Sequence, residues 1–208
     1  MANKRFAMTA IIIIIVIALF VAYTKFGKSS DPSIPKINIE LVPYEAHGFN
    51  VRSRLSSSQW ELICKVIHKK TARRGQTLTC QQCGDNGKRQ GFKHPVECHE
   101  VWDFDDEKRV QKLVGLISIC PLCHKAKHLG LADKMGYGDQ TRQHMAKHNR
   151  WNKDQVETYI AQAKNLVKKR SGKNYRLDLT YLNRKEFSFL RTRFTDDEQG
   201  NCDDTIKY

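Results

Sequence analysis

Hydrophobic side chains recur at helical spacing in three stretches of the chain. From Ser56 onward, apolar positions follow at i, i+3, i+4 and i+7, which predicts an amphipathic helix capped by the serine. These positions are Trp60, Ile63, Cys64 and Ile67. Residues 140–148 and 154–170 are predicted as two further helices, and Asn152 is the expected cap of the second.

Four shorter stretches have the alternating or continuous apolar pattern of β-strands. They are residues 37–41, 96–104, 116–119 and 175–181. Between the second and third stretch, the chain is expected to be helix-like or irregular through Leu113, and a helix is expected to follow Cys120. Because a strand, strand, helix order over residues 96–128 lies among further helices, the predicted fold class is α+β.

The amino-terminal stretch differs from the rest, because residues 6–24 are almost uninterruptedly apolar and include five consecutive isoleucines. These nineteen residues are enough to cross a bilayer as a helix. We therefore predict a single-pass membrane anchor at residues 1–26. A cleaved signal peptide is the rival interpretation, but no clear cleavage site follows the run. Cationic residues on both sides leave the orientation in the membrane open.

A linker, a domain and a tail are expected after the anchor. Residues 27–36 are rich in glycine, serine and proline, which is typical of a short linker. The folded domain is predicted at residues 37–182. Residues 183–208 carry several acidic side chains and little to bury, so a partly disordered acidic tail is expected there.

The sequence contains two Cys-x2-Cys pairs, Cys80 with Cys83 and Cys120 with Cys123, and 36 residues lie between them. Each such turn presents two thiolates to one ion, and tetrahedral Zn²⁺ takes four ligands. We therefore predict a closed structural zinc site, with paired buried thiols or disulfides as the alternative. The remaining cysteines are odd in number, which does not favour a disulfide framework. They are Cys64, Cys98 and Cys202.

Histidines and carboxylates gather around the second cysteine pair. The segment ECHEVW at residues 97–102 contains His99 and Glu100, and His124 and His128 follow Cys123. Two histidines four residues apart on a helix share one face and can hold one metal ion; hydrogen bonding to the zinc thiolates is their structural alternative. The other histidines are interpreted as surface or packing residues. They are His47, His68, His94, His144 and His148.

The chain is strongly basic, with a formal net charge of +14, which favours a polyanionic partner such as nucleic acid or an anionic membrane surface. The far end of the helix from Ser56 carries a cationic cluster, interpreted either as phosphate contacts or as partners of the helix dipole. Two more lysines stand beside the helix histidines. The candidate nucleic-acid-binding residues are Lys69, Lys70, Arg73, Arg74, Lys125 and Lys127.

These residues resemble the HNH endonucleases, in the form in which two Cys-x2-Cys pairs hold a ββα-metal finger. The matching motifs are Cys80-x2-Cys83, ECHEVW at 97–102 and LISICPLCHKAKH at 116–128, within residues 37–182. The resemblance implies divalent-metal-dependent hydrolysis of phosphodiester bonds in DNA. It also implies a structural Zn²⁺ and a catalytic Mg²⁺ or other divalent ion. In that family a histidine ending the first strand activates water, and the metal is held by the adjacent strand residue and a helix histidine.

Carried over to this chain, the pattern places the chemistry on His99, Glu100, His124 and His128. His99 is then the general base, with Glu97 or Glu100 nearby, or His99 binds the metal and Glu100 takes the proton. Strand alternation places His99 and Glu97 on one face and Glu100 on the other, which favours the first assignment.

The chain departs from the family five residues before the second cysteine pair. An asparagine often stands there in the family, whereas this chain has Gly115, which offers no side-chain amide. Gln111, four residues earlier, is the candidate substitute. We therefore expect a membrane-anchored endonuclease, with a catalytically weak or inactive zinc-held nucleic-acid-binding module as the alternative. A membrane-anchored protein-interaction module with a basic face is the third hypothesis.

Overall fold

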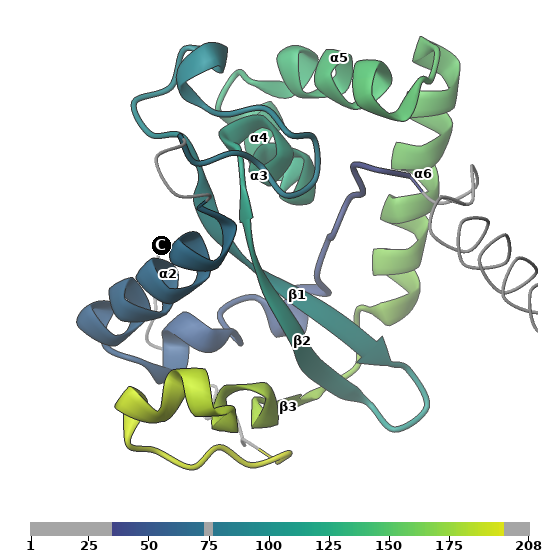
Figure 1. Cartoon of the computed structure of the whole chain (residues 1–208). Helices are drawn as coiled ribbons and strands as arrows, with labels where there is room; N and C mark the ends of the chain where they lie inside the picture. Colours follow the sequence, from purple (N-terminus) through teal and green to yellow (C-terminus); the bar gives the residue numbers. More distant parts are fainter. Residues whose placement is uncertain (1–34, 73–76, 198–208) are drawn as a thin grey trace, which may run out of the picture. The chain divides into compact units, whose positions relative to one another are not determined.

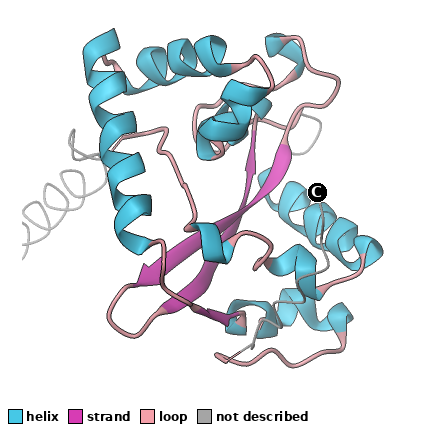
Figure 2. Ribbon diagram, turned by 180° about the vertical axis from the view of Figure 1, so that it is seen from behind, coloured by secondary structure: helices cyan, strands magenta, loops and turns pink. Residues whose placement is uncertain are grey.

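The computed structural model describes residues 35–72 and 77–197, and this part of the chain has an α+β fold (Figures 1 and 2). The helices are α2 (Ser57–Thr71), α3 (Pro121–Lys127), α4 (Leu129–Lys134), α5 (Gly138–Asn149) and α6 (Lys153–Arg170). The strands are β1 (Glu97–Asp105), β2 (Val110–Ile119) and β3 (Arg176–Asp178). Short 3-10 helices include η2 (Val51–Arg54), η4 (Thr180–Asn183) and η5 (Lys185–Leu190).

The sheet has the order β1-β2-β3 and is built around the long β1–β2 hairpin. β1 and β2 pair antiparallel, with an irregularity at Val101/Trp102, whereas β3 joins β2 in parallel. The prediction of a helix-like or irregular segment through Leu113 was wrong, because β2 already begins at Val110. Arg109 has a φ of 53°, a left-handed conformation that lets the chain turn back into β2 directly.

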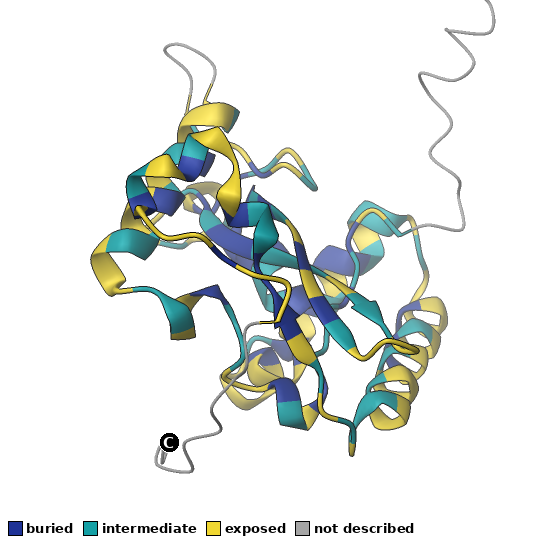
Figure 3. Ribbon diagram, turned by 90° about the horizontal axis from the view of Figure 1, so that it is seen from below, coloured by how far each residue is buried: buried dark blue, intermediate teal, exposed yellow. Residues whose placement is uncertain are grey.

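The two faces of the hairpin contribute to different hydrophobic cores. Cross-strand partners share a face, so His99 and its partner Ile117 lie on one side and Glu100 with Leu116 on the other. Ile117 packs against the core formed by α3, α4, α5 and α6, whereas Leu116 belongs to the core beneath α2. Buried positions accordingly lie on the inner sides of the elements around the sheet (Figure 3).

The predicted helix starts are confirmed by their capping interactions. Ser56 accepts a hydrogen bond from the Gln59 amide and Asn152 accepts one from Gln155, each in a capping box. Ile63 and Ile67, on the predicted apolar face of α2, are buried.

The first and last predicted strands differ from the structure. Residues 37–41 run as an extended segment outside the sheet. Ile37 pairs through both backbone groups with the Asn149 side chain, at 2.8 and 2.9 Å. Of the stretch 175–181, only Arg176–Asp178 forms a strand, because η4 begins at Thr180.

The folded region extends past the predicted boundary at residue 182. Phe187, Leu190 and Phe194 are buried in the core beneath α2, so the chain is held by packing as far as Phe194. The predicted anchor at 1–26, and most of the predicted linker at 27–36, lie outside the described residues. Among the residues described, none of the helices has the length and apolar character needed to span a membrane.

Candidate metal centres

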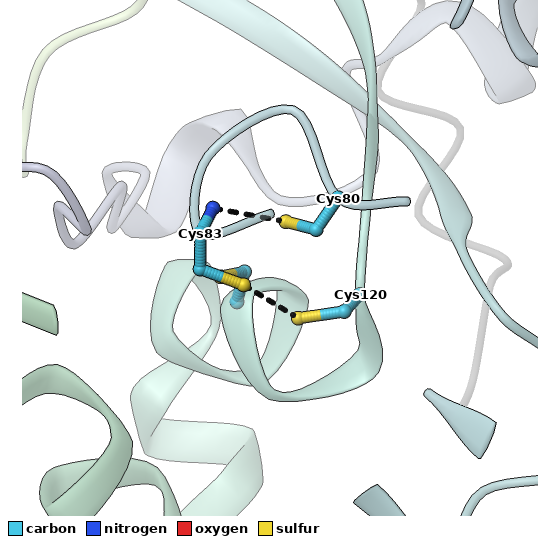
Figure 4. A group of neighbouring side chains, drawn as sticks. Cys80, Cys83 and Cys120 are labelled. Carbon is cyan, nitrogen blue, oxygen red and sulfur yellow. Dashed lines mark hydrogen bonds between the residues drawn. The ribbon is translucent and has the colours of Figure 1, made fainter. Parts of the chain in front are cut away.

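The four cysteines of the two Cys-x2-Cys pairs meet where the turn at residues 80–84 packs against the start of α3. Figure 4 shows three of them, Cys80, Cys83 and Cys120. Their sulfur atoms all lie within 4.8 Å of one another, and Cys83 Sγ is 3.5 Å from Cys120 Sγ. All but the half-buried Cys83 are buried. Four converging thiolates fit a metal such as structural zinc, and they leave no coordination position for a substrate.

Local amide groups stabilise this sulfur cluster. The Cys83 and Asp85 amides donate to the sulfurs of Cys80 and Cys83, each at 3.4 Å, and Gln90 Nε2 donates to Cys120 Sγ at 3.2 Å. Gly84 has a φ of 80°, the left-handed conformation that the turn after the first pair requires. These donors partly neutralise the charge that four thiolates would bring into the core.

Three imidazoles form a second cluster between β1 and α3. His99 extends from β1, His124 lies on α3, and His128 is the C-cap of that helix. Their ring centroids are 5.0 to 5.3 Å apart, and one nitrogen from each lies within 4.8 Å of the others. The structure therefore brings together the three histidines that the sequence suggested as ligands.

Carboxylates fix the orientation of two of these rings. His99 Nε2 is 2.9 Å from Glu40 Oε2, and His124 Nδ1 bonds to Glu97 Oε2. An ionised carboxylate only accepts hydrogen bonds, so the bonded nitrogen carries the proton. The remaining nitrogens, Nδ1 of His99 and Nε2 of His124, then present their lone pairs, as in metal sites in which a carboxylate orients the ligating histidine.

The electrostatics keep the carboxylates of Glu40 and Glu97 charged and favour the neutral form of His99 and His128. Burial alone would raise the pKa of Glu40, but the hydrogen bond from His99 and the charge of Lys127 lower it to about 2. Burial would also raise the pKa of Glu97, but hydrogen bonds from His124 and His94 lower it to about 2. Burial lowers the pKa of His99, and partial desolvation with the neighbouring imidazoles lowers that of His128 to about 3. Neutral imidazoles are the form that binds metal.

Glu100 lies apart from the imidazole cluster, on the opposite face of β1. Its Oε1 accepts a hydrogen bond of 3.0 Å from the Val51 amide of η2, and burial raises its pKa to about 7. The assignment in which Glu100 takes a proton beside His99 is therefore corrected, because strand alternation directs the two side chains to different cores.

Gly115 lies on the same face of the sheet as His99, opposite Val101. Added there, a Cβ would lie 3.6 Å from Val101 Cβ, an ordinary contact, so the backbone leaves room for a side chain. Gln111 does not substitute for the missing amide. Its side chain is buried at the other end of the hairpin, where Nε2 donates to the Phe49 carbonyl at 3.1 Å.

The predicted cationic contacts occupy different environments. Lys69 is exposed, and Lys70 pairs with Glu186 at 2.6 Å. Lys125 lies over the Tyr137 ring, with Nζ 4.2 Å from its centroid. The prediction that Lys127 contacts nucleic acid is corrected, because only 1% of its side chain is exposed and its Nζ is 2.5 Å from Glu40 Oε1. Residues 73 and 74 lie outside the described part of the chain.

Sequence reasoning missed three participants. Glu40 stands 59 positions before His99, and nothing in its local pattern distinguishes it. His94 was interpreted as a surface or packing residue and is exposed, but its contact with Glu97 was not predicted; its Nε2 is 2.5 Å from Glu97 Oε1. His144 was given the same interpretation and is buried, but its position beside the sulfur cluster was not predicted; its Nε2 is 3.3 Å from Cys123 Sγ. Its spacing of four from His148, the same as between His124 and His128, was the available signal.

Comparisons with protein-family models, with curated proteins and with solved structures found no match to this chain.

Proposed function

We propose that this protein is a metal-dependent endonuclease of the HNH type that hydrolyses phosphodiester bonds in nucleic acid, most readily DNA. The observation that carries the proposal is the imidazole cluster of His99, His124 and His128 beside a four-cysteine site. The order of hairpin and helix supports it, as does the net charge of +14, which favours a polyanionic substrate. Tethering of the enzyme to a membrane through residues 1–26 belongs to the same proposal.

His124 and His128 are assigned to the metal, because both come from one end of α3 and His124 is oriented by Glu97. The ion would polarise a phosphoryl oxygen and stabilise the charge that develops on the leaving oxygen. His99 is assigned as the base that takes the proton of the attacking water at Nδ1. Glu40 holds the His99 ring through Nε2 and so fixes the tautomer that this step needs.

The ligand atoms of the site indicate which metal ion it would bind. Mg²⁺ prefers oxygen ligands, whereas imidazole suits Zn²⁺, Ni²⁺ and related transition ions. Because the nearest donors are imidazole nitrogens and the adjacent carboxylates are engaged with them, we propose a transition ion rather than Mg²⁺.

Plasmid nicking by the purified full-length protein tests the proposal, in Mn²⁺, Co²⁺, Ni²⁺, Zn²⁺ and Mg²⁺ and with a chelator. We expect nicking in transition ions. His99→Ala should lose at least about 100-fold, since general bases typically contribute 10²–10⁴-fold, and His124→Ala should lose activity because it loses a metal ligand. His47→Ala, at an exposed histidine outside the imidazole cluster, is the matched control and should keep full activity. Zinc content and circular dichroism establish that each variant is folded.

Measuring metal binding distinguishes the role of a general base from that of a metal ligand. His99→Ala should keep the transition ion while losing activity, whereas His124→Ala should lose both. Loss of the ion in His99→Ala would instead make His99 a third ligand. Nicking that persists in His124→Ala would overturn the proposal.

Gly115 favours the second candidate, a nucleic-acid-binding module without catalysis. It faces the same side of the sheet as His99 and supplies no amide to orient the base or the metal. This candidate requires salt-sensitive DNA binding by folded, zinc-loaded protein together with an absence of cleavage in every ion.

A further inference from the structure

A third group of donor atoms lies where α5 packs beside the sulfur cluster. His144 and His148 are four residues apart on α5, and together with Cys83 they bring one ligand atom each within 4.8 Å of the others. We infer that Cys83, His144 and His148 form a second metal position that shares the Cys83 thiolate with the four-cysteine site. The inference does not depend on the proposed function.

The position of His144 is the strongest geometric support. This residue is 7% exposed, and its Nε2 lies 3.3 Å from Cys123 Sγ and 4.0 Å from Cys120 Sγ. The rings of His144 and His148 lie next to each other, with their centroids 4.4 Å apart. Asn149, the next residue, is held by both backbone groups of Ile37, which fixes this end of α5.

Charge favours a second cation at this place. A divalent ion bound by four thiolates carries a formal charge of −2, and burying uncompensated charge is costly. A second divalent ion held by Cys83 and two neutral imidazoles would make the pair formally neutral. Cys83 suits a bridging role, because it is half-buried whereas the other three cysteines are buried.

The competing explanation is a hydrogen bond alone, in which His144 Nε2–H donates to Cys123 Sγ. That bond explains the position of His144 but not the convergence of His148 and Cys83 on the same place. One thiolate and two imidazoles are donors that Zn²⁺ and Co²⁺ accept, and three protein ligands leave the fourth tetrahedral position open.

Ion counting by native mass spectrometry tests the inference on the full-length protein reconstituted with excess Co²⁺ or Zn²⁺. His148→Ala should bind one ion fewer than the unmodified chain. Its Co²⁺ absorption should lose the bands of a mixed sulfur and nitrogen site and keep those of the four-thiolate site. Retention of the four-thiolate bands shows that this variant is folded. Gln143→Ala, an exposed position on the same helix, is the matched control and should keep the full count.

An unchanged ion count and spectrum in His148→Ala would overturn the inference and leave His144 as a hydrogen-bond donor only. His124→Ala reports on the imidazole cluster separately. If His124→Ala changes nothing while His148→Ala loses one ion, the shared-thiolate site stands and the metal site of the proposed nuclease fails. If instead His124→Ala loses one ion and His148→Ala changes nothing, only the shared-thiolate site is rejected.

Discussion

Replacing Lys127 by methionine tests how much the most buried charged side chain of the described residues contributes to the free energy of unfolding. Lys127 Nζ bonds to Glu40 Oε1 at 2.5 Å and also to Asn38 Oδ1, and its side chain is 1% exposed. Methionine has a similar length and no charge, so Lys127→Met preserves packing while leaving the Glu40 carboxylate without its cation.

Removing one partner of a buried ion pair costs about 3–5 kcal/mol. Glu40 keeps 19% of its side chain exposed and retains His99 as a partner, so we expect a loss near the lower end, about 3 kcal/mol. Adding Glu40→Gln removes the unpaired charge. The double variant should therefore lose less than the two single losses added together, with a coupling of about 2 kcal/mol.

Urea denaturation at a fixed excess of zinc measures these free energies of unfolding. Lys125→Met is the matched control on the same helix, and it should cost no more than about 1 kcal/mol, the value of a partly exposed cation–π contact. A loss below about 1 kcal/mol in Lys127→Met, accompanied by a clear fall in DNA affinity, would refute the reasoning and restore Lys127 as a phosphate contact.

Three further predictions concern single positions. Glu100 has a folded pKa of about 7 against an ordinary value of 4.5, so the folded state binds more protons between these pH values and stability falls as pH rises through them. Glu100→Gln should therefore be more stable than the unmodified chain by up to about 3 kcal/mol at pH 8, with the difference shrinking toward pH 5; a difference independent of pH would contradict the burial argument. Gly115→Asn, for which the backbone has room, should raise the nicking rate at unchanged stability, and equal or lower rates would show that the position plays no part. Cys120→Ser should release zinc, as measured by a chromogenic chelator, and unfold the domain at 37 °C, and undiminished zinc affinity would exclude the four-thiolate site.

The parts predicted well from the sequence are those set by neighbouring residues. Helix caps and helical periodicity act within one or two turns, so the caps of α2 and α6, Ser56 and Asn152, are the predicted residues, and α6 begins one residue before the predicted start at residue 154. The spacing of each Cys-x2-Cys pair likewise fixes two ligands of one turn. Alternation along β1 correctly separated His99 from Glu100, because side-chain direction in a strand depends only on the count of residues.

The parts predicted poorly depend on contacts between distant segments. Residues 37–41 alternate like a strand, but their backbone is taken up by Asn149 and by Lys127, whose carbonyl accepts from the Glu40 amide at 3.3 Å. Phe187 and Phe194 lie among charged residues in the sequence, and only the position of the core beneath α2 explains their burial. Glu40 became a partner of His99 for the same reason, since it is brought there by the tertiary fold.

The short helix α3 connects the two clusters physically. Cys120 is its N-cap and Cys123 lies in its first turn, while His124 and His128 follow on the side that faces β1. Successive residues of a helix point about 100° apart, so adjacent Cys123 and His124 face different clusters. An ion held by the four cysteines would anchor α3 to the turn at residues 80–84. Because a helix of seven residues has little stability of its own, the geometry of the imidazole cluster then depends on that anchor.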